Sequence, residues 1–115
     1  MVIGSKGLQE VNLIIPQGTS LYFEIVQTDE DGQTVNHSRS SIKCKMENAG
    51  GEEVKDLSAY CYGTARAILV DIPKSFTAEL VPCEYRWDLI ATLQTGTAMR
   101  LCYGIVEIVD TYAND

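Results

Sequence analysis

Residues 84–109 constrain the fold more than any other stretch of the chain, because they predict one long β-hairpin. Period-two alternation of apolar and polar side chains is typical of a strand with one buried and one hydrated face. Ile90 is the exception and would face outward. In the first arm, the inward residues are Tyr85, Trp87, Leu89, Ala91 and Leu93, and the outward ones are Glu84, Arg86, Asp88 and Thr92.

The turn of this hairpin is predicted at residues 94–97, Gln-Thr-Gly-Thr, since Gly accepts a positive φ at little cost. The single Trp of the chain, Trp87, lies in the middle of the first arm, so we expect it to anchor the core. The second arm, residues 98–110, is again strand-like, and its alternation places Met99, Leu101, Tyr103 and Ile105 on one parity.

Shorter strands precede the hairpin. Asp-Gly at 31–32 and Gly-Gly at 50–51 predict two tight chain reversals in this part of the sequence. Polar residues 33–41 are either a poorly buried edge or a loop between sheets, and residues 60–63 are either a strand end or a loop. The expected strands are 8–15, ended by Pro16, then 20–27 with Leu21, Phe23 and Ile25 opposite Tyr22, Glu24 and Val26, then 42–47, 54–57 and 64–72.

Residues 73–80 are the one place where a helical turn is favoured over a strand. Phe76 and Leu80 are four positions apart and would meet on one face of a turn, closing the end of a sandwich. Several short strands separated by Gly or Pro turns predict an all-β sandwich or barrel. We expect an immunoglobulin-like antiparallel β-sandwich of about seven strands with one short helical turn near 74–80. The antibody-type disulfide is not expected, because Trp87 follows Cys83 instead of lying between two linked cysteines.

Length and composition favour one folded domain. The chain has 115 residues, 45% of them apolar. We expect this domain at 8–110, with a flexible N-terminal arm at 1–7 and a C-terminal tail at 111–115. The net charge of −7 argues against nucleic-acid and anionic-membrane partners, which need a basic face. No apolar run approaches the roughly 20 residues of a membrane span, and the start has no secretion signal, so we expect folding in a cytoplasm.

Cys44, Cys61, Cys83 and Cys102 are expected to be free thiols. A cytoplasm is reducing, and buried thiols pack as small hydrophobes. No pair has the C-x-x-C spacing of a zinc or redox motif. The alternative is that these thiols are oxidised later, if the protein finally leaves the cell.

The sequence contains no recognisable catalytic constellation, and no catalytic, cofactor-binding or metal-binding residue is expected. His37, the one histidine, lies among polar residues, where a surface-loop histidine is favoured over a general base. The acidic run at 29–31 before Gly32 resembles part of a calcium loop. It lacks the distant bidentate Glu, so a hairpin turn is favoured.

The aromatic residues divide into expected core and expected surface. Half-exposed aromatics on an all-β domain suit a protein contact or a glycan equally well. The partner-contact candidates are Tyr22, Tyr60, Tyr62, Leu8 and Tyr112. The expected core anchors are Phe23, Phe76, Tyr85, Trp87, Leu89, Leu101 and Tyr103.

Four segments together resemble one family of phage proteins. They are Ile-Pro-Gln-Gly-Thr-Ser-Leu-Tyr-Phe at 15–23, Thr-Asp-Glu-Asp-Gly-Gln-Thr-Val-Asn at 28–36, the stretch 70–89 with Thr-Ala-Glu-Leu before Tyr-Arg-Trp-Asp-Leu, and Leu-Cys-Tyr-Gly-Ile-Val-Glu-Ile at 101–108. The family is the immunoglobulin-like β-sandwich found at the front of bacteriophage baseplate upper proteins and as stand-alone tail or head accessory proteins. Two departures are Cys83, where a turn Gly is usual, and the absence of Pro after the Asp-Gly hairpin.

The resemblance implies a role in assembly and transfers no active site. We therefore expect a non-enzymatic bacteriophage virion structural protein of the tail, baseplate or capsid decoration, made in the host cytoplasm. Its expected partners are other virion proteins and further copies of itself as a homo-oligomer, with no cofactor. The alternative is a carbohydrate-binding module that uses Tyr22, Tyr60 and Tyr62 on host-surface glycans.

Overall fold

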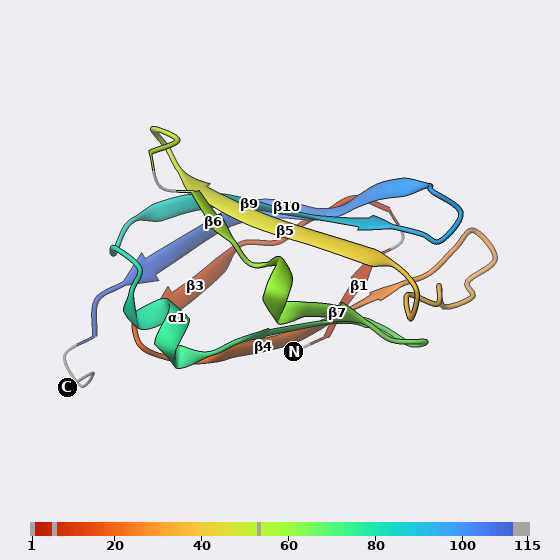
Figure 1. The fold of residues 1–115 in the computed structure, drawn as a ribbon, viewed down its shortest axis with the longest axis horizontal. Coiled ribbons are helices and arrows are strands. Elements are labelled where there is room, and N and C mark those ends of the chain that lie inside the picture. The colour runs from red at the N-terminus through yellow and green to blue at the C-terminus, as the bar shows by residue number, and fades with distance from the viewer. Residues whose placement is uncertain (1, 6, 53, 112–115) are drawn as a thin grey trace.

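Two β-sheets face each other across the core in this computed structural model, which describes residues 2–5, 7–52 and 54–111. Figure 1 shows the sheets as two layers, with the short helix α1 at one end. The strands are β1 (Val2–Ser5), β2 (Gln9–Glu10), β3 (Leu13–Pro16), β4 (Leu21–Gln27), β5 (Ser41–Asn48), β6 (Val54–Asp56), β7 (Cys61–Gly63), β8 (Ile68–Ile72), β9 (Glu84–Thr92) and β10 (Ala98–Val109). The helical elements are α1 (Lys74–Ala78) and a 3₁₀ turn (Ser58–Tyr60).

The strands form a four-stranded sheet and a six-stranded sheet. The four-stranded sheet has the order β1-β4-β8-β7. The six-stranded sheet has the order β2-β10-β9-β5-β6, and β3 also pairs with β10. The all-β sandwich predicted from the sequence is confirmed. The described residues contain ten strand segments instead of about seven, because the expected strand 8–15 is divided and short strands are added at the sheet edges.

The N-terminal residues do not form the expected loose arm. Strand β1 pairs in parallel with β4, with Val2 opposite Glu24 and Gly4 opposite Val26. Strands β2 and β3 then run parallel to β10, so the chain crosses from one sheet to the other between β1 and β2. Both sheets are therefore mixed, with these parallel pairs added to the antiparallel pairs of the expected sandwich. The reason is that unpaired backbone groups of an edge strand are satisfied by any extended segment within reach.

The predicted alternation of β9 is confirmed, and this strand holds the centre of the core. Tyr85, Trp87, Leu89 and Ala91 are buried. The indole Nε1–H of Trp87 donates a hydrogen bond to the carbonyl oxygen of Val11 at 2.8 Å. Val11 lies between β2 and β3, so the break in the expected strand 8–15 coincides with the bond to the indole.

A β-bulge in β10 overturns the expected parity of the second hairpin arm. The register against β9 shifts between Arg100 and Cys102, and Leu101 and Cys102 are both buried. An inserted residue exchanges the two faces for every residue that follows. Tyr103, an expected core anchor, therefore faces outward, with the Arg100 guanidinium 4.9 Å from its ring centroid. Ile105 is likewise exposed, and the inward positions become Val106 and Ile108.

The predicted helical turn is confirmed at the end of the sandwich. Thr77 is buried, and its Oγ1 donates a hydrogen bond to the carbonyl oxygen of Thr19 at 2.7 Å, which ties α1 to the start of β4. Phe76 is half-buried and packs against the core, whereas the expected anchors Phe23, Tyr85, Trp87, Leu89 and Leu101 are buried.

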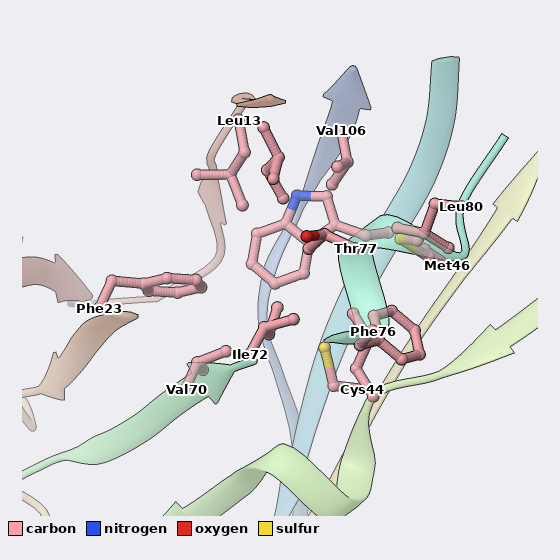
Figure 2. Close-up of a pocket in the computed structure, with 13 residues that line it drawn as sticks. Leu13, Phe23, Cys44, Met46, Val70, Ile72, Phe76, Thr77, Leu80 and Val106 are labelled. Carbon is pink, nitrogen blue, oxygen red and sulfur yellow. The ribbon is translucent and has the colours of Figure 1, made fainter. Parts of the chain in front are cut away.

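Figure 2 shows Phe76, Thr77 and Leu80 on one side of the pocket and Phe23 and Val70 on the other. These residues line an apolar cavity of about 10 Å³. That volume is at the lower limit for one water molecule, and an apolar lining offers water no hydrogen-bond partner. The cavity is a packing void and not a ligand site.

Candidate interaction face

The outer surface of the four-stranded sheet gathers two of the predicted contact residues. Alternation along β4 turns Tyr22 outward together with Glu24 and Val26, because Phe23 and Ile25 occupy the buried positions between them. Strand β7 turns Tyr62 outward in the same way. We call this surface the tyrosine face and define it by Val2, Tyr22, Glu24, Val26, Tyr62, Leu69 and Asp71.

The strand register places these side chains next to one another. Leu69 of β8 is at the centre, with Glu24 opposite it on β4 and Tyr62 opposite it on β7. Tyr22 lies opposite Asp71, one step further along the same pair of strands. Directly opposed side chains are about 4.5–5.5 Å apart at Cβ, and long side chains also reach their diagonal neighbours. Tyr22 and Tyr62 therefore flank Leu69 on one continuous surface.

The tyrosine face leaves apolar surface uncovered. Val2 is 61% exposed, Tyr62 51% and Tyr22 48%, whereas Leu69 and Val26 are half-buried between their neighbours. Single exposed hydrophobes are ordinary on a soluble protein. A contiguous apolar and aromatic patch is typical of an interaction surface.

The electrostatics of the tyrosine face are acidic. The Tyr22 hydroxyl donates a hydrogen bond to Oε1 of Glu24 at 3.1 Å. Partial loss of hydration, together with this bond and the nearby Tyr62 and Asp71, raises the pKa of Tyr22, so its phenol stays a neutral donor. Strands β1, β4, β7 and β8 contain no Lys or Arg. A partner would therefore meet two aromatic rings beside two carboxylates that no strand cation neutralises.

The outer surface of the six-stranded sheet has a different character. Lys45 lies opposite Asp88, and Glu47 lies opposite Arg86, so charges of opposite sign alternate across the strands. Arg100 Nε is 3.3 Å from Oδ2 of Asp88. An open groove of about 310 Å³ between these side chains is lined by both signs of charge. Exposed ion pairs of this kind contribute little stability and suit a hydrated surface.

The remaining predicted contact residues lie elsewhere. Tyr60 is half-buried in the 3₁₀ turn, and its ring meets Phe76 edge-on at a centroid distance of 5.3 Å. It therefore belongs to the packing at the α1 end and not to the tyrosine face. Leu8 is 50% exposed where the chain crosses between β1 and β2. Tyr112 lies outside the described residues.

His37 is not the surface-loop histidine that the sequence favoured. It is fully buried, with Nε2 2.7 Å from Oε1 of Gln27 and Nδ1 2.8 Å from Oγ of Ser40. An amide oxygen only accepts, so Nε2 carries the proton and Nδ1 accepts from the serine hydroxyl. Burial lowers the pKa of His37, which keeps the ring neutral. One sequence signal could have predicted a buried polar partner such as His37. Gln27 follows Phe23 and Ile25 on the inward-facing positions of β4, so its side chain needs a buried hydrogen-bonding partner.

The acidic run before Gly32 forms the predicted turn. Oδ1 of Asp29 accepts hydrogen bonds from the backbone N–H groups of Asp31 and Gln33, each at 2.9 Å, and Gly32 has φ +78°. The Asp29 carboxylate is thus already used by the turn. Over the described residues there is no group of three or more His, Cys, Asp or Glu side chains that could hold a metal. No helix in that part of the chain is long and apolar enough to cross a membrane.

Comparison with known proteins gives weak structural similarity alone. No family model matches the chain, and no curated protein matches its sequence. Among solved structures, the chain is similar to part of a family 123 glycoside hydrolase from Clostridium perfringens, with 10% identity and a TM-score of 0.47. The match covers 89% of this chain and 23% of the hydrolase, so the chain spans about a quarter of that enzyme's length. A similarity at this level supports neither a function nor a family.

Proposed function

We propose that this chain is a non-enzymatic structural protein of a bacteriophage virion, a tail, baseplate or capsid accessory subunit that assembles through its tyrosine face. The observation behind the proposal is the exposed pair Tyr22 and Tyr62 around Leu69 on a sheet with no cation. The phage assignment rests on the resemblance of residues 15–23, 28–36, 70–89 and 101–108 to virion immunoglobulin-like domains.

The chemistry of the tyrosine face favours a protein partner. Tyrosine rings give a large contact area for few rotatable bonds and are enriched among residues that dominate binding energy. Val2 and Val26 extend the apolar surface beyond the two rings. A flat apolar surface of this extent is buried more completely by another protein than by one sugar ring.

The charge of the tyrosine face indicates what that partner carries. Two copies docked face to face would bring Glu24 and Asp71 of each copy toward the same carboxylates of the other, which is unfavourable. A virion protein with Lys or Arg opposite these carboxylates would pair with them. The homo-oligomer expected from the sequence, if it forms, uses another surface.

The test is incorporation into virions. Particles of the phage that encodes the chain are grown with the wild-type gene or with the double variant Tyr22→Ser/Tyr62→Ser, and the protein is quantified by mass spectrometry. We expect incorporation to fall at least about tenfold, since loss of two aromatic anchors removes more than 1.4 kcal/mol. The matched control is Ile105→Ser, which removes an exposed hydrophobe on the opposite sheet and should leave incorporation unchanged. Absence of the wild-type protein from purified particles would refute the proposal.

A second function, glycan binding, is favoured by one observation. Tyr22 and Tyr62 are exposed beside the carboxylates of Glu24 and Asp71, an arrangement in which rings stack on a sugar and carboxylates accept from its hydroxyls. A glycan array with the wild-type chain and the same double variant distinguishes the two functions. Array binding that depends on both tyrosines, together with virions that lack the protein, would favour the carbohydrate-binding module.

A further inference from the structure

The chain crosses from the six-stranded to the four-stranded sheet through residues 57–60, and this crossing is anchored on the backbone of Cys44. The N–H of Leu57 donates to the carbonyl oxygen of Cys44 at 2.7 Å. The N–H of Cys44 donates to Oγ of Ser58 at 3.0 Å, and the same hydroxyl lies 3.4 Å from the Cys44 carbonyl oxygen. Both peptide groups of Cys44 are therefore bound to Leu57 and Ser58.

Cys61 is anchored on the same crossing from the other sheet. It begins β7 directly after the 3₁₀ turn, and its Sγ donates to the carbonyl oxygen of Leu57 at 3.4 Å. Cys44 is buried in the core, and Cys61 is half-buried and packs against that core. Two cysteines on opposite sheets thus share Leu57 as a common hydrogen-bonding partner, and the strands that hold them, β5 and β7, are in contact.

We propose that Cys44 and Cys61 are the site of an inter-sheet disulfide, formed when the folded protein meets a small disulfide oxidant such as oxidised glutathione. Cys61 attacks one sulfur of oxidised glutathione, which gives a mixed disulfide and releases one glutathione. Cys44 loses its proton to solvent and displaces the second glutathione from Cys61. Two protein thiols are oxidised to one disulfide, and one oxidised glutathione is reduced to two thiols.

The order of these steps follows from the surroundings of the two thiols. The hydrogen bond with Cys61 and burial raise the pKa of the Cys44 thiol, so it is the poorer first nucleophile. Cys61 is half-buried, so it is the thiol that the oxidant can reach. Cys44 also lines the apolar cavity of Figure 2.

Neither of the other two cysteines is within disulfide reach of Cys44. Cys44 and Cys102 both lie opposite Leu89, on either side of β9. Two strand spacings separate them by about 9–10 Å, beyond the roughly 7 Å that a disulfide spans between Cα atoms. Cys83 precedes β9 and is six positions from Leu89, which is about 20 Å along an extended strand. Burial also raises the pKa of Cys102, to about 11, which makes it unreactive.

The experiment uses the purified full-length chain in its reduced, folded state. It is incubated with oxidised glutathione at pH 8, quenched with iodoacetamide, and analysed by intact mass and by peptide mapping without reduction. We expect loss of two alkylatable thiols, a peptide joined through Cys44 and Cys61, and full alkylation of Cys83 and Cys102 after unfolding. The oxidised form should also melt at least about 5 °C higher than the reduced form, because the cross-link restricts the unfolded chain.

Two variants assign the steps. Cys44→Ser should stop the reaction at a glutathione adduct on Cys61, whereas Cys61→Ser should give no cross-link and no adduct on Cys44. Cys83→Ser is the matched control and should form the Cys44–Cys61 bond at the wild-type rate. Any of three outcomes would overturn the proposal. The folded wild type could keep four free thiols after oxidation, the adduct on Cys61 could persist without forming a protein disulfide, or a cross-link could form through Cys83 or Cys102. None of these outcomes depends on the function of the tyrosine face.

Discussion

Replacing Trp87 with Ala removes two contacts at the centre of the sandwich and enlarges a void. The ring is 4% exposed and meets Phe23 edge-on at a centroid distance of 6.1 Å. Its Nε1–H is the donor to the carbonyl oxygen of Val11. It also lines the existing apolar void, so truncation would enlarge a cavity that the core already leaves unfilled.

The expected cost is about 4–5 kcal/mol of unfolding free energy. Truncating a buried large aromatic to Ala costs about 3–5 kcal/mol through lost transfer free energy and the cavity left behind. The Val11 carbonyl would lose its donor, and an unsatisfied buried acceptor costs about 1–3 kcal/mol, so the total lies toward the upper end. Trp87→Phe keeps most of the apolar volume but loses the indole donor, so we expect about 1–3 kcal/mol for that variant.

The assay is urea denaturation followed by far-UV circular dichroism, because the variants lack the tryptophan fluorescence. Ile105→Ala is the matched control, since this hydrophobe is 40% exposed on the outer face of β10 and should change stability by less than about 0.5 kcal/mol. A cost below about 1 kcal/mol for Trp87→Ala would contradict the inward assignment of β9. Equal stability of Trp87→Phe and wild type would show that the bond to Val11 contributes nothing.

Three further predictions concern close contacts and pH. Because burial lowers the pKa of His37 below its usual 6.5, the unfolded chain binds more protons, and the unfolding free energy should fall as the pH drops below 6.5. Urea melts at pH 7.5, 6.5 and 5.5 should show this loss of stability in the wild type and a smaller loss in His37→Gln. An equal loss in both proteins would show that His37 does not cause the pH dependence. A Cβ on Gly63 would collide with the His37 carbonyl oxygen, so Gly63→Ala should cost about 1–3 kcal/mol in the same melts. A Cβ on Gly104 would collide with the Val11 carbonyl oxygen, so Gly104→Ala should cost a similar amount, while Gly4→Ala, with nothing within 4 Å, should be neutral.

The local sequence pattern was sufficient to predict the structure wherever a single strand decides which side chains are buried. The alternation of β9, the inward Phe23 and Ile25 of β4, and the helical turn around Phe76 were all predicted from the sequence and are present in the structure. Each depends on periodicity or on a turn residue within a few positions. The same alternation placed Tyr22 on an outer surface, although it did not show that Tyr62 lies on that surface too.

The local sequence pattern gave wrong predictions where pairing between distant segments decides which side chains are buried. The bulge after Arg100 is set by the register between β10 and β9, and it turned Tyr103 outward against its own parity. The burial of His37 depends on an acceptor ten positions earlier, Gln27, and the polar residues on either side of His37 indicate a surface loop instead.

The sequence by itself determined the fold class, the main hairpin and the buried face of its first arm, because alternation and turn chemistry are properties of neighbouring residues. Tertiary structure alone decided the pairing of β1 with β4, the assembly of the tyrosine face from four strands, and the anchoring of both Cys44 and Cys61 on Leu57. Each of these brings together residues from different strands. Their geometry follows from how the two sheets pair and pack, and no single stretch of sequence contains it.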